Sequence, residues 1–160
     1  MRFPRAFVVS VVALLAGPAW AAGGGGGSGG APPGAKSADV SKAERLIEQK
    51  NWDQAVEVLT QAAARDDSDA DVFNWLGYAE RNRGNLDAAF RHYARALELD
   101  PKHRGAHEYV GEAYLMVGDL AKAKEHLAKL AKLCRSRCEE YEDLKQEVAE
   151  YEERQARTAP

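Results

Sequence analysis

The chain has 160 residues, and its 22 lysines and arginines against 25 aspartates and glutamates give a formal net charge of −3. This length suits a single domain, and a chain without a basic cluster lacks the positive surface that phosphate backbones require. Nucleic acid is therefore not expected as a partner.

Residues 1–21 are typical of a secretory signal peptide. Arg2 and Arg5 give a positive start, residues 6–16 form an apolar core, and Ala19-Trp20-Ala21 supplies a small-x-small cleavage site. A membrane span needs about 20 apolar residues, and this core is shorter. We therefore expect secretion across the inner membrane, a periplasmic location and no stable membrane anchor after signal cleavage.

Residues 22–37 form a linker rich in glycine and proline. Glycine loses much conformational entropy on ordering, and the segment has few apolar side chains that could offset that cost. A flexible tether is expected here.

An internal repeat with a constant interval begins beyond this linker. Segments that start at Asn51, Asn85 and Asp119 align, so that Ala55, Ala89 and Ala123 fall in register, as do Leu59, Tyr93 and Leu127. Apolar residues recur at helical spacing, which predicts helix–turn–helix units. Gly84 and Gly118 are expected to end the first helix of their units, and small residues such as Gly77 and Gly111 allow close helix packing.

The segment FNWLGYAERNRGNLDAAFRHYARALELDP, residues 73–101, resembles the tetratricopeptide repeat consensus, with Phe73, Leu76, Gly77, Ala89, Tyr93, Ala96 and Pro101 in the expected positions. The unit at 104–137 matches with His107 in an aromatic position, whereas the unit at 36–69 is degenerate in its opening helix. The resemblance implies an all-α, right-handed α-solenoid over residues 38–137, with units at 36–69, 70–103 and 104–137.

Residues 138–156 are predicted to form a capping helix. Tyr141, Leu144, Val148 and Tyr151 make one narrow apolar stripe on an otherwise acidic segment. A solenoid needs such a helix to cover its last apolar surface. The final residues, 157–160, are expected to be a disordered tail.

The two cysteines, Cys134 and Cys138, flank the predicted turn between the third unit and the capping helix. In an oxidising compartment such a pair favours a disulfide that clips the two elements together. Two alternatives stay open. Zinc would need His107 and His126 to converge on the cysteines, and a redox role would use the basic neighbours of the thiols, Arg135 and Arg137.

No motif of an enzyme stands out, so no catalytic residue, metal or cofactor is predicted. His92 and His126 lie one repeat apart and are expected to be half-exposed. His103 and His107 have a spacing of four but no evident carboxylate partner. These are therefore predicted to be surface or packing histidines.

The resemblance implies a concave groove formed by the first helices of the units. Its predicted lining residues are Asp71, Asn74, Tyr78, Arg81 and Asn82, followed by Glu108, Glu112, Leu115 and Met116. Their mixed polarity suits a peptide or a protein segment, although they are too acidic to resemble the basic array with which some family members capture chaperone tails.

The leading hypothesis is therefore an exported, non-enzymatic scaffold or adaptor that binds a protein or peptide in this groove. The alternative is a thiol-redox or metal-handling envelope protein that acts through Cys134 and Cys138. Self-association through the acidic terminal helix is a third possibility.

Overall fold

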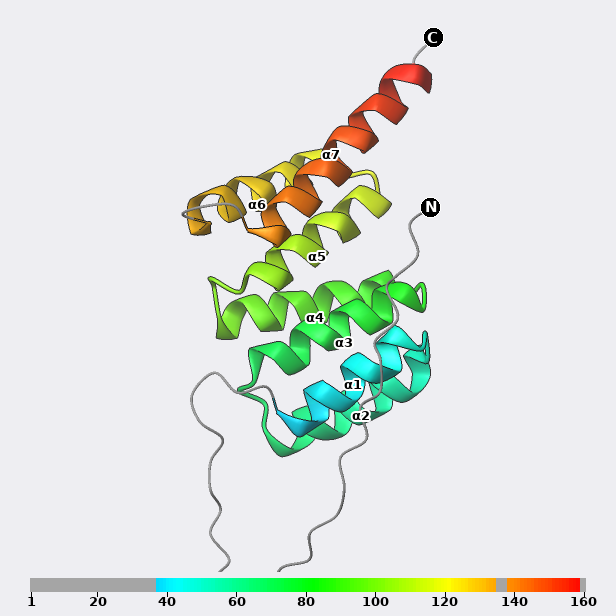
Figure 1. Ribbon diagram of the computed structural model, residues 1–160, viewed down its shortest axis with the longest axis vertical. Coiled ribbons are helices and arrows are strands. Elements are labelled where there is room, and N and C mark those ends of the chain that lie inside the picture. Colours follow the sequence, from blue (N-terminus) through cyan, green and yellow to red (C-terminus); the bar gives the residue numbers. More distant parts are fainter. Residues whose placement is uncertain (1–36, 135–137, 159–160) are drawn as a thin grey trace, which may run out of the picture. The chain divides into compact units, whose positions relative to one another are not determined.

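A computed structural model describes residues 37–134 and 138–158, and this part of the chain is helical without β-strands (Figure 1). The helices are α1 (Ala38–Glu48), α2 (Trp52–Arg65), α3 (Ala70–Asn82), α4 (Leu86–Leu99), α5 (Arg104–Met116), α6 (Leu120–Leu133) and α7 (Glu139–Thr158). The predicted all-α solenoid of three helix pairs and a terminal helix is confirmed. The predicted signal peptide and nearly all of the linker lie outside the described residues.

Side-chain caps start several of these helices. Ser37, assigned to the linker in the sequence analysis, instead accepts a hydrogen bond from the Val40 amide at the start of α1. Asp69 and Asp119 cap α3 and α6 in the same way. Such caps satisfy amide groups that have no carbonyl partner inside the helix.

The turn inside each helix pair contains one residue in the left-handed region, and the three residues are spaced at the repeat interval. Gly84 and Gly118 have φ angles of 83° and 81°, which confirms their predicted role. The first pair has Lys50 at this position, with φ of 56°. The first unit therefore has the same turn geometry, although its sequence is degenerate. At Lys50 this conformation is less favourable than at a glycine, because the Cβ atom of lysine lies close to the backbone.

Helices pack as the pairs α1–α2, α3–α4 and α5–α6, and each pair contacts the next (Figure 1). At the centre of the second pair, the fully buried Tyr93 ring of α4 lies directly against Gly77 of α3. A Cβ atom on Gly77 would come within 2.5 Å of ring carbons of Tyr93. The glycine therefore provides the space that the tyrosine ring fills.

The equivalent glycine of the third pair has a different partner. Gly111 of α5 lies against Leu144 of α7, whose Cδ2 would be 2.5 Å from an added Cβ atom. Leu144 and Val148 are buried, and Tyr141 and Tyr151 pack beside them, which confirms the predicted apolar stripe. The terminal helix therefore packs closely on α5 as well as on α6.

The prediction of a disordered tail from residue 157 is wrong for its first two residues. Helix α7 continues to Thr158, whose hydroxyl donates to the carbonyl groups of Arg154 and Gln155. Residues 139–158 contain no proline or glycine that would interrupt the helix. Residues 159–160 lie outside the described part of the chain.

A pair of histidines is buried between α5 and α6, which corrects the expectation that His126 is half-exposed. His107 Nδ1 lies 2.9 Å from His126 Nδ1, and His107 Nε2 lies 3.1 Å from the Pro101 carbonyl oxygen. A consistent proton arrangement has His107 donating to Pro101 and accepting from His126. Burial lowers the pKa of both rings, that of His126 to about 4, with His107 and Lys129 adding unfavourable charge.

The other two histidines also have defined neighbours. His103 Nε2 lies 2.9 Å from an Asp71 carboxylate oxygen, so the expectation that no carboxylate partner exists is wrong for this residue. His103 also caps α5 by accepting from the Ala106 amide. His92 is half-buried and its ring stacks on Phe73.

Among the described helices, none is long and apolar enough to cross a membrane.

Replacing Gly77 with alanine should cost about 1–3 kcal/mol in overpacking, because the buried Tyr93 ring cannot move aside without disturbing its neighbours. The higher helix propensity of alanine offsets about 1 kcal/mol of this cost, so we expect a net loss of stability of up to about 2 kcal/mol. Urea unfolding followed by circular dichroism measures the change. Gly105→Ala is the matched control, since its Cβ atom would meet only ordinary contacts at 3.4 Å or more. Equal stability of Gly77→Ala and the parent chain would contradict this packing.

The histidine pair should make the fold sensitive to acid. The unfolded chain binds protons to histidine below about pH 6.5, whereas the folded chain resists protonation of His126 until about pH 4. The stabilising contribution is therefore complete above pH 6.5 and falls with pH, by about 2 kcal/mol between pH 7 and 5.

Urea unfolding at several pH values, for the parent chain and for His126→Asn, measures this dependence. The variant lacks the titrating ring, so its stability should fall less steeply between pH 7 and 5. Identical pH profiles of the two proteins would show that His126 does not resist protonation.

Candidate functional site

The candidate site is a groove along α1, α3, α5 and α7. A cavity of about 310 Å³ is lined by α1, α3 and α5, and cavities of about 320 Å³ and 300 Å³ are lined mainly by α3, α5 and α7. Trp75 and Tyr109 line both the 310 Å³ and the 320 Å³ cavity. A smaller cavity shares Glu108 with the 320 Å³ cavity and Glu112 with the 300 Å³ cavity. The hollows are therefore sections of one groove.

Most of the predicted groove residues line these cavities. Asp71, Asn74 and Glu108 line the 320 Å³ cavity, and Tyr78 lines the 310 Å³ cavity next to α1. The 300 Å³ cavity, beside the end of α7, is lined by Arg81, Glu112, Leu115 and Met116. Asn82 does not line any of the cavities described here; it is exposed and its amide donates to the Tyr78 carbonyl. Leu115 is largely buried in the core under α7, so its contribution to the groove surface is small.

An aromatic cluster occupies the middle of the groove. The rings of Tyr78 and Tyr109 lie 4.8 Å apart, and Trp75 lies 5.6 Å from Tyr78 and 6.1 Å from Tyr109. The Arg81 guanidinium lies 5.1 Å from the Tyr78 ring and 5.7 Å from the Tyr109 ring, within cation–π range. These half-buried rings provide a rigid apolar surface that still faces the groove.

Arg81 also links α3 to α5 through an ion pair with Glu112. Both side chains are mostly buried, at 12% and 20% exposed, so neither charge is well hydrated. Pairing offsets part of the cost of that burial. The positive charge of Arg81 is therefore engaged inside the protein and does not make the groove basic.

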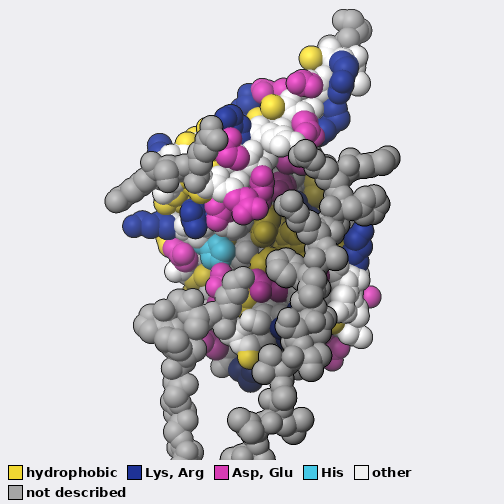
Figure 2. Space-filling view, viewed as in Figure 1, with side chains coloured by type: hydrophobic (Ala, Val, Ile, Leu, Met, Phe, Trp, Pro, Cys, Tyr) yellow, Lys and Arg dark blue, Asp and Glu magenta, His cyan; other side chains and the backbone are white. Residues whose placement is uncertain are grey.

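Acidic side chains dominate the section of the groove around the 320 Å³ cavity, which is bounded by α3, α5 and the start of α7. Besides Asp71, its carboxylates are Glu108 of α5 and Glu139, Glu140 and Asp143 of α7. Figure 2 shows Asp and Glu side chains gathered beside apolar side chains on one face of the molecule. Burial raises the pKa of Glu108 to about 8, and the negative charges of Glu112, Asp143 and Glu140 add to this effect.

Asn74 lies at the base of the same section. Its side chain is 3% exposed, and Oδ1 has no hydrogen-bond partner among the described residues. A buried amide oxygen without a donor is energetically costly. Asn74 lines the cavity, so a donor that enters this part of the groove could satisfy it.

Several groove residues were missed by the sequence analysis, chiefly Trp75, Tyr109 and the acidic residues of α7. Trp75, Tyr109 and Asp143 are successive members of one repeat position. The repeat interval relates these three residues to one another, so recognising one of them as a groove residue would have identified the other two.

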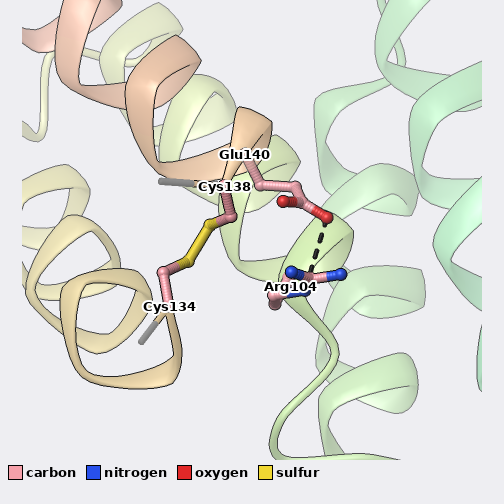
Figure 3. The surroundings of a disulfide bond; sticks show 4 residues. All are labelled: Arg104, Cys134, Cys138 and Glu140. Carbon is pink, nitrogen blue, oxygen red and sulfur yellow. Dashed lines mark ion pairs between the residues drawn. A yellow bond between two sulfur atoms is a disulfide. The ribbon is translucent and has the colours of Figure 1, made fainter. Parts of the chain in front are cut away.

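The cysteine pair lies where α6 ends and α7 begins. Cys134 and Cys138 form a disulfide in the structure, with Cα atoms 5.8 Å apart, and the helices stop at Leu133 and restart at Glu139 (Figure 3). Arg104 pairs with Glu140 at 3.4 Å, joining the start of α5 to the start of α7. The first turn of α7 is thus held to two helices. The intervening turn, including Arg135 and Arg137, lies outside the described residues.

The described residues contain no group of three or more His, Cys, Asp and Glu arranged to hold a metal ion. His107 and His126 do converge, but they contact each other and the Pro101 carbonyl. Both cysteine sulfurs are bonded to one another and are not available as thiolate ligands in this state.

Comparison with known protein families gives two matches, both described as tetratricopeptide repeat, over residues 40–103 and 81–148. A comparison with curated protein sequences finds no match. Together the two family matches extend from residue 40 through all three helix pairs to the first half of the terminal helix.

Solved structures with the same fold include SycD, the type III secretion translocator chaperone of Yersinia enterocolitica, with a TM-score of 0.64 and 22% identity over 74% of this chain and 82% of SycD. SycD in complex with a peptide of the translocator YopD gives a TM-score of 0.63 at 22% identity, over 76% and 92% of the two chains. The first TPR domain of human RPAP3 gives 0.65 at 16% identity, over 76% and 94%. At these identities the similarity concerns the fold alone.

The constant repeat interval, the three stacked helix pairs closed by a terminal helix, and both family matches agree: the chain belongs to the tetratricopeptide repeat family.

Proposed function

We propose that this protein is a non-enzymatic interaction module that binds a segment of a protein partner in the groove along α1, α3, α5 and α7. The observation that carries the proposal is the aromatic cluster of Trp75, Tyr78 and Tyr109, whose rings are fixed by mutual contacts yet line open cavities. Aromatic side chains of this kind dominate protein recognition, because they bury a large area with little loss of conformational freedom.

Structures of the same fold support a peptide-binding role. SycD is solved with a peptide of YopD, and the first TPR domain of Spaghetti (RPAP3) is solved with the HSP90 peptide SRMEEVD. That second peptide carries two glutamates, one aspartate and one arginine. The groove described here is itself acidic, so we do not propose the same ligand for it.

We further propose that the protein works in the periplasm after export. Support comes from the positive and apolar start of the sequence and from the cysteine pair, since disulfides persist in oxidising compartments. In this setting the disulfide acts as a structural clip that keeps α7 on α5 and α6. Closing a five-residue loop contributes about 2 kcal/mol on the chain-entropy estimate.

Photocrosslinking in cells that produce the full chain tests the groove. A benzoylphenylalanine at position 78 places the photoreactive ring beside Tyr109, whereas one at position 91 projects from an exposed site on α4. We expect discrete adducts with another protein from position 78 and none from position 91. Adducts from position 91 alone, or from neither position, would refute the proposal. An adduct of twice the chain's mass would indicate self-association.

Replacing both cysteines with serine should lower the free energy of unfolding by about 2 kcal/mol, roughly 5–15 °C in melting temperature. The crosslinked products from position 78 should remain, because the cysteines lie outside the aromatic cluster. Thermal unfolding with and without reductant measures the first effect. Unchanged stability together with lost adducts would instead favour the alternative thiol-redox or metal-handling role of Cys134 and Cys138.

A further inference from the structure

The groove section around the cavity of about 320 Å³ combines carboxylates from α3, α5 and α7 with aromatic walls. Glu108 of α5 and Asp143 of α7 both line the cavity of about 320 Å³, and Trp75 and Tyr109 line it beside them. Binding sites for small ligands occupy roughly 300–1,000 Å³, so this cavity lies at the lower limit of that range. It therefore suits one long side chain better than a whole small-molecule ligand.

The negative charge of this section is not neutralised internally. Glu140 is paired with Arg104, and Asp71 with His103. Within residues 37–134 and 138–158, neither Glu108 nor Asp143 makes a hydrogen bond or an ion pair through its carboxylate. Glu108 is only 8% exposed, so its ionised form lacks both hydration and a counter-charge.

Asn74 is a second and independent indication that something binds here. Its Oδ1 atom is buried without a donor among the described residues, and its side chain lines the same cavity. A ligand that donates hydrogen bonds would satisfy this oxygen together with the two carboxylates. A ligand that only accepts hydrogen bonds would satisfy neither this oxygen nor an ionised carboxylate.

We infer that this cavity binds a lysine or arginine side chain from an extended segment of a partner protein. The cationic group lies between Glu108 and Asp143, donates to Asn74 Oδ1, and contacts the aromatic walls formed by Trp75 and Tyr109. Each of these groups favours a cation, the carboxylates by charge and the rings by their electron-rich faces. The inference rests on the proposed function, because it names the chemistry of the segment that the groove receives.

Glu108 also predicts how binding depends on pH. The groups that face it are Glu112 on its own helix, Asp143 and Glu140 on α7, and Arg81 on α3. Its pKa of about 8 in the empty groove means that it is largely protonated at pH 6.5. A bound cation favours the ionised form, so affinity should increase from pH 6.5 to pH 8.5 as that form becomes available.

Selection of random dodecapeptides displayed on phage, with the immobilised full chain as bait, tests the inference. Three baits are compared: the parent chain, the double variant Glu108→Gln with Asp143→Asn, and a control with the same loss of charge, Glu125→Gln with Glu153→Gln. The control residues are exposed and line none of the cavities described above. Each selected peptide is resynthesised with its basic residues replaced by glutamine, and affinities are measured by fluorescence anisotropy.

We expect lysine and arginine to be enriched at least threefold over the starting library on the parent chain and on the control. Replacement of the basic residue by glutamine should weaken binding at least tenfold on these two proteins and less than threefold on the double variant. Affinity of the basic peptide for the parent chain should fall several-fold from pH 8.5 to pH 6.5, and Glu108→Gln alone should abolish most of this dependence.

Peptides that bind without a basic preference, or whose preference persists on the double variant, would overturn the cation site and leave the groove function intact. Failure of the parent chain to enrich any peptide would refute both proposals. Selected sequences that match segments of this chain would overturn the inference of a separate partner and indicate a second copy as the occupant.

Discussion

The close approach of helices at two glycines of the repeat determines where the groove lies and what closes it. Gly77 admits the ring of Tyr93, which joins the helices of the second pair, and Gly111 admits Leu144, which brings the terminal helix onto α5. A larger side chain at either position would push its partner outward. Because α7 packs on α5 through this contact, its acidic side chains form a wall of the groove as well as a cover for the core.

The aromatic cluster of the groove adjoins its most acidic section, and Trp75 and Tyr109 line both parts. Its centre holds aromatic rings ordered by contacts among themselves and with Arg81, and the ion pair with Glu112 keeps that arginine from attracting anionic ligands. The section closed by α7 holds two carboxylates, those of Glu108 and Asp143, that have no partner among the described residues. Two different kinds of side chain can thus be recognised a short distance apart, which gives direction to a bound segment.

Much of the fold was predictable because the constant repeat interval orders apolar, small and turn residues together. Gly84 and Gly118 could be assigned to left-handed turns from residue type and spacing together, whereas Lys50 was not, since a lysine is not a residue type that favours such a conformation. The burial of His126 could not be predicted, because it depends on contact with His107, which lies in another helix. The unpartnered state of Asn74 is likewise a property of packing, and its residue type does not reveal it.

The central claim is that a partner segment lies in the groove beside α7. The most direct test follows the backbone amide NMR signals of the full chain while a peptide selected on the parent chain is added. The account predicts shifts concentrated on α3, α5 and the first half of α7, with α2, α4 and α6 nearly unchanged. Shifts concentrated on α4 and α6, with the signals of Asn74 and Gly105 unmoved, would contradict it.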